Sequence, residues 1–238
     1  MNVISEPIVR KKLSDEVFAR LKQMIETGEL KAGDEMPSER ELMERYGVGR
    51  PAIREAMQAL AGKGLVEISQ GERAKVLRIT AESIIRQVDL PAKLMLSGSS
   101  DSLEHLKNAR IFFERGMVRE AAAKAAPTHI SELRALLDKQ KQSLGDADAF
   151  IDADMEFHQC IALISGNPIF AAVSGAMLGW LKSYHTEMLI WTGRENFTLS
   201  EHEEIIRAIE SRDADRAEQA MVKHLERSRA LYALKGQK

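Results

Sequence analysis

One aspartate and three histidines in the second half of the chain are the side chain types of a transition-metal site. Asp154 and His158 are four residues apart, so on a helix both project from one face. His202 and His224 lie on two later segments with helical periodicity. If these segments pack as a bundle, one carboxylate and three imidazoles can hold a divalent ion such as zinc, nickel or manganese. The spacing equally fits histidines that bind no metal.

Arginines form a second group, in the first 80 residues. Arg50 and Arg54 are four apart and share one face of a predicted helix. Arg40 lies near the start of the preceding helix, and Gly71 and Arg73 lie at a predicted hairpin tip. Arginine makes bidentate hydrogen bonds to guanine and to phosphate, so the group indicates a nucleic-acid interface. Taken singly, each arginine also fits an ordinary solvated surface.

The arginines must be positioned by a compact domain, and the helix caps and glycine turns of this region predict one. Ser14 is expected to cap a first helix that Gly28 closes, and Ser38 with Glu41 forms a capping box for a second. A third helix is expected over residues 51–61. Two short strands follow, over residues 65–68 and 74–79, joined by a glycine turn. This order of elements predicts a winged helix-turn-helix, whose last helix enters a major groove.

Helices must bring the histidines together. From residue 81 onward helical periodicity dominates, and glycine and proline are sparse. Asp213 is a predicted cap for the last helix, and Ser200 with Glu203 a predicted capping box for the one before it. The result is an all-α antiparallel bundle. The expected helices span residues 81–96, 101–125, 128–144, 147–164, 168–191, 199–211 and 214–235.

Length and charge favour two domains, over residues 1–80 and 81–238. The formal net charge of the 238 residues is -2, which argues for no global attraction to nucleic acid. Divided at residue 80, the first part carries 14 Lys/Arg and 13 Asp/Glu, or +1, and the second 20 and 23, or -3. The single cysteine, Cys160, and the absence of an apolar run near the ~20 residues of a membrane helix indicate a cytoplasmic protein without a membrane partner.

Three motifs stand out in the first domain: Pro37-Ser38-Glu39-Arg40-Glu41-Leu42, Tyr46-Gly47-Val48-Gly49-Arg50, and Ile53-Arg54-Glu55-Ala56 continuing to Val66. With these motifs, the domain resembles the DNA-binding domain of GntR-family bacterial transcription regulators. It implies that Arg40, Arg50 and Arg54 contact operator DNA. It also implies that Gly71 lets the wing approach the minor groove, with Arg73 beside it.

The second domain has motifs of its own: Arg110 with Glu114, Asp154-Met155-Glu156-Phe157-His158, Gly166-Asn167-Pro168, Glu201-His202, and Met221 to Leu225. With these motifs, it resembles the FCD effector domain of the FadR subgroup in that family. The resemblance implies that Asp154, His158, His202 and His224 hold a divalent metal, most often zinc. It implies that Arg110 pairs with the carboxylate of a small organic-acid effector, and that two copies form a homodimer.

Four further segments are similar to the subgroup's regulators of sialic-acid catabolism: residues 10–14, 71–76, 111–114 and 166–170. We therefore expect a ligand-responsive repressor of a catabolic operon, not an enzyme, with a sialic or other sugar acid as the hypothetical effector.

Two alternatives to this regulator remain open from the residues. The bundle could be a metal-dependent enzyme acting on a small organic acid, with Glu156 or Glu201 as general base. The metal could also be purely structural, holding helices together. For Arg110, the simpler interpretation is a salt bridge to Glu114, one helical turn away.

Overall fold

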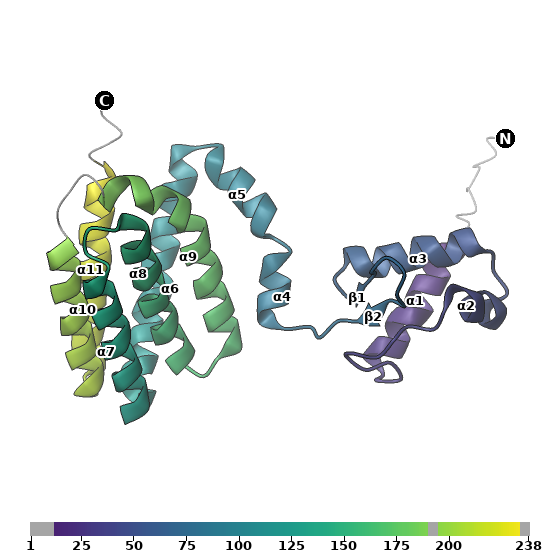
Figure 1. Ribbon diagram of the computed structural model, residues 1–238, viewed down its shortest axis with the longest axis horizontal. Helices are drawn as coiled ribbons and strands as arrows, with labels where there is room; N and C mark the ends of the chain where they lie inside the picture. Colours follow the sequence, from purple (N-terminus) through teal and green to yellow (C-terminus); the bar gives the residue numbers. More distant parts are fainter. Residues whose placement is uncertain (1–11, 190–194, 234–238) are drawn as a thin grey trace, which may run out of the picture. The chain divides into compact units, whose positions relative to one another are not determined.

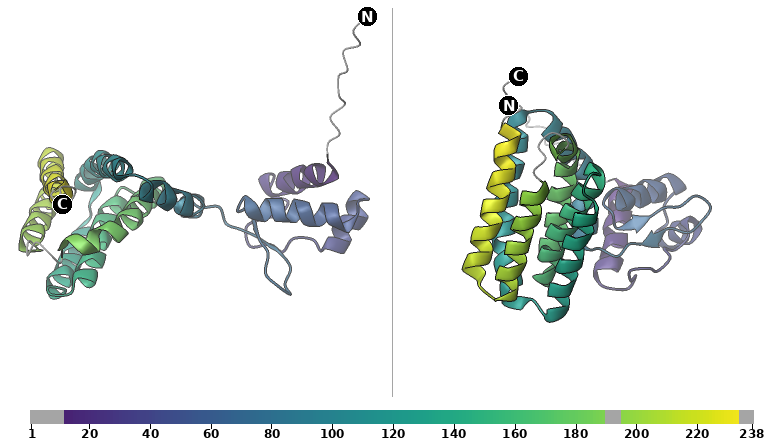
Figure 2. Two further views of the ribbon diagram at one scale, coloured as in Figure 1. Left: turned by 90° about the horizontal axis from the view of Figure 1, so that it is seen from above. Right: turned by 60° about the vertical axis from the view of Figure 1, so that its left-hand side comes forward.

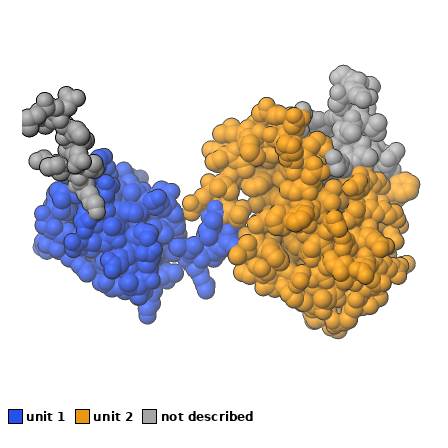
Figure 3. All heavy atoms as spheres, turned by 180° about the vertical axis from the view of Figure 1, so that it is seen from behind, with its two compact units in different colours: residues 1–84 blue, residues 85–238 orange. Residues whose placement is uncertain are grey.

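The computed structural model describes residues 12–189 and 195–233, so the basic residues Arg10 and Lys11 of the first sialic-type segment lie outside the described residues. The chain divides into two compact units, residues 1–84 and 85–238, coloured blue and orange in Figure 3. We call them the head and the body. The division falls after Ile84, inside a short helix α4 (Ala81–Arg86), whereas the sequence predicts the domain boundary at residue 80.

Ahead of α4, the described residues of the head form three helices and a two-stranded hairpin (Figure 1). Their order is that of a winged helix-turn-helix, as predicted from the sequence. The strands pair antiparallel, with Val66 opposite Val76 and Glu67 opposite Lys75, and are shorter than expected. The elements are α1 (Leu13–Glu26), α2 (Glu39–Tyr46), α3 (Arg50–Gly62), β1 (Val66–Glu67) and β2 (Lys75–Val76).

One apolar core holds these elements together, with Leu21, Leu42, Ile53 and Leu60 completely buried. The capping box of α2 is confirmed, because Glu41 N–H donates to Ser38 Oγ at 3.2 Å while Ser38 N–H donates to Glu41 Oε2 at 2.7 Å. The predicted cap of α1 is wrong. Helical backbone begins at Leu13, so Ser14 lies within the first turn and its side chain is buried.

The body is an all-α bundle, as predicted (Figure 1). Its long helices lie side by side with nearly parallel axes (Figure 2, right). Successive helices from α6 to α9 run antiparallel across short turns, as do α10 and α11. They are α5 (Asp89–Ser97), α6 (Ser100–Lys124), α7 (Pro127–Gln142), α8 (Ala147–Ile164), α9 (Pro168–Leu189), α10 (Glu195–Glu210) and α11 (Ala214–Ala233).

Two expectations for the body's helices are wrong. The helix expected over residues 81–96 is broken into α4 and α5, because Pro91 lacks an N–H and its ring would clash with the carbonyl of Gln87 in a continuous helix. Ser200 does not cap the following helix, since α10 already begins at Glu195 and buries Thr198 and Leu199 in its early turns. The Asp213 cap of α11 is confirmed by a 3.0 Å hydrogen bond from the Arg216 N–H to Asp213 Oδ1.

Helix α8 lies at the centre of the body and packs against α6, α7 and α9. It is buried on most of its surface, and its core side chains include Phe150, Phe157 and Ile161. Asp154 and His158 are buried on the same helix. Polar side chains with such burial need partners, because their desolvation otherwise costs several kcal/mol. The partners come from the neighbouring helices.

Candidate metal centre and nucleic-acid interface

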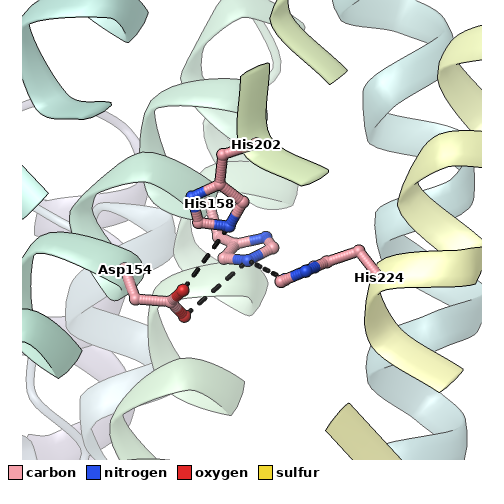
Figure 4. A group of neighbouring side chains, drawn as sticks. All are labelled: Asp154, His158, His202 and His224. Atoms are coloured by element: carbon pink, nitrogen blue, oxygen red, sulfur yellow. Dashed lines mark hydrogen bonds and ion pairs between the residues drawn. The ribbon is translucent and has the colours of Figure 1, made fainter. Parts of the chain in front are cut away.

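The four residues expected to bind a metal converge in the body. Asp154 and His158 come from α8, His202 from α10 and His224 from α11, and their side chains point toward one another (Figure 4). All four are buried, and one ligand atom from each lies within 4.8 Å of the others. Residues separated by up to 70 positions in sequence (224 minus 154) therefore form one compact cluster.

The spacing inside this cluster fits a tetrahedral ion. Two ligand atoms that are each about 2.1 Å from a tetrahedral zinc lie about 3.4 Å apart. Here His158 Nε2 lies 3.2 Å from His224 Nε2 and 3.8 Å from Asp154 Oδ2, and His202 Nε2 lies 3.5 Å from Asp154 Oδ1. Side chains at these separations can close on an ion with only small rotations.

The outward-facing nitrogen of each imidazole is held by an acceptor. His158 Nδ1 contacts Glu114 Oε2, His202 Nδ1 lies 2.8 Å from Gln140 Oε1, and His224 Nδ1 lies 2.9 Å from Glu201 Oε2. Ionised carboxylates and the Gln140 amide oxygen can only accept, so these partners place a proton on each Nδ1. In a neutral ring with that proton, Nε2 presents a lone pair to the centre of the cluster, which is the arrangement of metal-binding histidines.

Without a cation, this arrangement is electrostatically incomplete. His202 Nε2 is buried and has no hydrogen-bond partner among the described residues. His158 Nε2 and His224 Nε2 lie 3.2 Å apart, so if both rings carry their only proton on Nδ1, two lone pairs face each other. Buried polar atoms are normally satisfied, and a divalent ion would satisfy these three nitrogens and the Asp154 carboxylate together. The residues present thus fit a metal.

Burial and neighbouring charges shift the pKa values of the cluster in consistent directions. Burial lowers the pKa of His202 well below its usual value and that of His224 also, so both rings are neutral near pH 7. Burial alone would raise the pKa of Asp154, but the three histidines beside it lower that pKa. Neutral His202 and His224 rings beside an ionised Asp154 are in the protonation states in which these side chains bind a metal.

Arg110 lies on α6 and is buried against this cluster. Its Nε donates to Glu114 Oε1 at 2.5 Å, which is the salt bridge that the sequence offered as the simpler interpretation. Burial opposes ionisation of Glu114, but the charges of Arg110 and His158 lower the pKa of Glu114 to about 2. Glu114 is therefore a fixed anion that touches both the arginine and a metal-site histidine.

The sequence did not reveal which residues hydrogen-bond to the four candidate metal ligands. Gln140 on α7 is completely buried and connects two members of the cluster, since its Nε2 donates to Asp154 Oδ1 at 3.1 Å while its Oε1 faces His202. Glu201, a candidate general base in the enzyme alternative, instead holds His224 and accepts from Arg227 at 2.8 Å. These contacts cross from one helix to another, so no spacing within a helix reveals them.

In the head, the predicted DNA-contacting side chains are exposed and each pairs with a carboxylate. Arg54 Nε donates to Glu39 Oε1 at 2.8 Å, and Arg50 Nε lies 3.4 Å from Glu39 Oε2. Both project from α3. The Nε of Arg40 on α2 donates to Glu44 at 3.1 Å, and that of Arg73, in the segment between the strands, lies 4.0 Å from Glu35.

Gly71 lies in the turn between β1 and β2 with a positive φ of 82°. A side chain there would strain the backbone, because L residues other than glycine rarely adopt this conformation. The turn therefore brings the wing backbone to the surface without a side chain in front of it. None of the described helices is long and apolar enough to cross a membrane.

Comparison with known proteins assigns both units. Residues 13–76 match the bacterial regulatory proteins of the gntR family, and residues 105–227 match the FCD domain. The chain is 44% identical over 223 residues to an HTH-type transcriptional repressor NanR of Cronobacter sakazakii, covering 92% of this chain and 85% of the relative. It is 41% identical over 238 residues to a repressor of the same name from Escherichia coli, covering 99% of this chain and 90% of the relative.

The fold agrees with a solved structure. The Streptococcus agalactiae GntR structure superposes with a TM-score of 0.69 at 24% identity, covering 91% of this chain and 99% of that one.

Both candidate general bases of the enzyme alternative are engaged in ion pairs, Glu156 with Lys139 and Glu201 with Arg227. The chain therefore belongs to the GntR family of bacterial regulatory proteins with an FCD domain, and is a ligand-responsive DNA-binding transcription regulator and not an enzyme.

Proposed function

We propose that the protein represses a catabolic operon and that a small carboxylate-bearing metabolite, bound at a metal in the body, changes its affinity for operator DNA. The observation that carries this proposal is the convergence of three imidazole Nε2 atoms and the Asp154 carboxylate beside the buried Arg110. Repression is supported by relatives named transcriptional repressors at 41–44% identity.

The proposed DNA interface consists of Arg40, Arg50, Arg54, Gly71 and Arg73. Arg50 and Arg54 lie in the first turns of α3, the helix that enters the major groove in this fold. Their guanidinium groups can bind guanine O6 and N7 or a phosphate. Arg40 and Arg73 would contact phosphates on either side, while the Gly71 turn would bring the wing to the minor groove.

The proposed metal is zinc, with Asp154, His158, His202 and His224 as its ligands; nickel and manganese are the alternatives. Imidazole and carboxylate donors suit all three ions. The bound ion would supply a positive charge that accepts a carboxylate oxygen of the effector. Elemental analysis of protein purified without chelator tests this assignment. We expect about one zinc ion per chain, and an ion-free protein of full stability would contradict it.

Arg110 is the proposed partner of the effector's carboxylate, since a guanidinium fork matches two carboxylate oxygens. An arriving anion would have to share Arg110 with Glu114, which already occupies its Nε. N-acetylneuraminate is the first effector to test, because of the sequence resemblance to regulators of sialic-acid catabolism. Calorimetric titration of zinc-loaded protein should give saturable heat, and no heat would exclude this sugar acid.

We further propose a homodimer in the cytoplasm that presents two recognition helices to a roughly palindromic operator. Light scattering coupled to gel filtration tests the mass of the assembly against the 26.6 kDa of one chain. Selection of bound duplexes from a random library yields the operator sequence directly. A two-fold symmetric sequence is expected, and an asymmetric one would contradict the paired heads.

A structural role for the metal is the second candidate, favoured by the burial of the cluster between three helices. His202→Ala separates the two roles. If the variant stays folded and dimeric but its gel shift with the selected duplex no longer responds to the effector, the metal senses the ligand. If it unfolds while the remaining folded fraction keeps the effector response, the metal only stabilises the bundle.

A further inference from the structure

The carboxylate of Glu39 lies between the two arginines of the recognition helix. Its Oε1 accepts from Arg54 Nε at 2.8 Å, and its Oε2 lies 3.4 Å from Arg50 Nε. Each carboxylate oxygen therefore faces one guanidinium. A single negative charge offsets two positive charges that would otherwise repel each other across one turn of α3.

Local structure fixes this carboxylate in place. Glu39 is the first residue of α2, directly after the Ser38 cap, where the helix dipole favours a negative charge. Its side chain is 37% exposed, whereas the other ion-paired carboxylates among the described residues of the head are 52–67% exposed. A partly shielded charge with two partners is held more firmly than a single exposed pair.

Glu39 also faces the space where DNA would bind in the proposed function. A hollow of about 460 Å³ opens between α2, α3 and the wing segment. Its polar lining includes Glu39, Arg54 and Gln58 on the helices and Glu72 and Arg73 on the wing segment. In the proposed complex, a sugar-phosphate strand would pass between the recognition helix and the wing. A carboxylate in this hollow would lie close to phosphates.

The effect of the Glu39 carboxylate on binding differs between random DNA and the cognate operator. Binding to random DNA depends on phosphate contacts alone, so Glu39 weakens it twice: it repels the phosphates and it occupies the arginines. On a cognate site, base edges replace Glu39 as partners of the arginines, and a carboxylate can itself accept from a cytosine amino group. The cost of releasing the arginines is then offset only where the correct bases are present.

We propose that Glu39 is a specificity-determining residue, which holds Arg50 and Arg54 away from phosphates and thereby suppresses binding to non-cognate DNA. The inference rests on the proposed DNA face of the head. An acidic residue on that face would thus discriminate against non-cognate DNA, which the basic residues alone do not do.

The experiment compares Glu39→Gln with Glu16→Gln in the full-length protein. Both substitutions remove one negative charge from the head, but Glu16 pairs with Arg20 on α1, which carries none of the proposed DNA contacts. Fluorescence anisotropy measures binding to a random-sequence 30-bp duplex and to the duplex selected by the wild-type protein, each at several salt concentrations. Thermal unfolding of each variant is recorded in parallel.

For Glu39→Gln we expect roughly three- to tenfold tighter binding to the random duplex and a salt slope steeper by about one ion. The affinity for the selected duplex should rise less or fall, so the ratio of the two affinities decreases. Glu16→Gln should change both affinities by less than about twofold.

A purely structural tie between α2 and α3 predicts the opposite sign. In that case Glu39→Gln lowers the unfolding temperature and weakens binding to both duplexes, with an unchanged salt slope, and the proposal is wrong. Equal effects of the two variants also overturn it. Arg54→Gln tests the DNA face separately, since unchanged binding of that variant to both duplexes would reject the interface itself and not only the role of Glu39.

Discussion

Charged side chains serve opposite purposes in the two units. In the head, the arginine side chains proposed to contact DNA are 53–85% exposed, and each lies beside a carboxylate that is also partly exposed. In the body, Arg110 and Glu114 are 6% and 3% exposed and belong to a connected set that includes three histidines and Asp154. Exposed pairs contribute little to stability and exchange readily for phosphate. Buried pairs are costly to desolvate and need every partner present.

This difference predicts that the head tolerates the loss of a charge, whereas the body does not. The head can give up its internal ion pairs when DNA arrives, since little free energy of unfolding depends on them. The body cannot, because each buried group is the partner of another. Four predictions test the contrast, from the largest expected effect to the smallest.

Removing a metal ligand should have the largest effect. His202→Ala is expected to lower zinc affinity by more than about 100-fold. Losing only a residue that hydrogen-bonds to a metal ligand already lowers metal affinity by about 10–100-fold. Competition with a fluorescent chelator measures this affinity. The control is His105→Ala, which removes an exposed histidine from the same unit. Equal zinc affinities of the two variants would show that His202 is not a ligand.

Removing the partner of a ligand should have the next largest effect. Glu114→Gln and Glu201→Gln each replace the ionised acceptor of an imidazole Nδ1, and each should weaken zinc binding by about 10–100-fold. Glu120→Gln removes a partly exposed carboxylate of α6 that pairs only with Lys124 in the described ion pairs, and should leave zinc affinity unchanged. If all three variants bind zinc like the wild type, the imidazoles are not oriented by these carboxylates.

Acidification should destabilise the body when a chelator keeps it free of metal. The pKa values of His202 and His224 are lowered by burial, so below their unfolded value of 6.5 protons bind the unfolded chain preferentially. Stability should therefore be level above about pH 7 and fall as the pH drops below 6.5, by at most ~1.4 kcal/mol per pH unit for each histidine. Thermal unfolding in chelator from pH 8 to pH 5 measures the slope.

The matched comparison for this slope is His202→Asn against His105→Asn. The first substitution removes one of the buried histidines and should reduce the slope below pH 6.5. The second removes an exposed one and should leave it as in the wild type. A slope that is the same in all three proteins would mean that the buried rings are not the groups that titrate.

Removing a surface pair of the head should have the smallest effect. Glu16→Gln breaks the 3.3 Å contact between Arg20 and Glu16, both of which are more than half exposed. The free energy of unfolding should change by less than ~0.5 kcal/mol, as is typical of exposed pairs one helical turn apart. Urea unfolding measures it. A loss of 2 kcal/mol or more would erase the contrast between the units.

The fold could be predicted from the sequence wherever local signals decide it. The capping box at Ser38, the cap at Asp213 and the helical periodicity of the body all have local causes, and the structure agrees with them. The single helix expected over residues 81–96 was wrong although Pro91 is itself a local signal, and the two cap predictions failed because a serine has more than one possible position in a helix. Ser14 and Ser200 have the chemistry of caps, but helical backbone begins before each of them.

The candidate metal centre could be predicted only in part. Asp154 and His158 share a helical face, which spacing reveals. His202 and His224 could be proposed as ligands from their residue type on later helices, but only the family resemblance favoured them over histidines that bind no metal, because helix packing brings them there. Gln140 gave no signal, since a single glutamine on an amphipathic helix is usually exposed. Its position between Asp154 and His202 depends on the packing of α7 against α8 and α10.

The candidate metal centre draws on nearly every long helix of the body, with one exception among the residues whose side chains the structure describes. Its ligands lie on α8, α10 and α11, and their partners Glu114, Gln140 and Glu201 lie on α6, α7 and α10. On helix α9, none of residues 168–182, whose side chains the structure describes, supplies either. An ion bound at the candidate centre would slow amide hydrogen exchange in the connected helices as one cooperative block. Residues 168–182 would be coupled to that block only through packing against the neighbouring helices α6 and α8, so their amides should gain less protection from the ion.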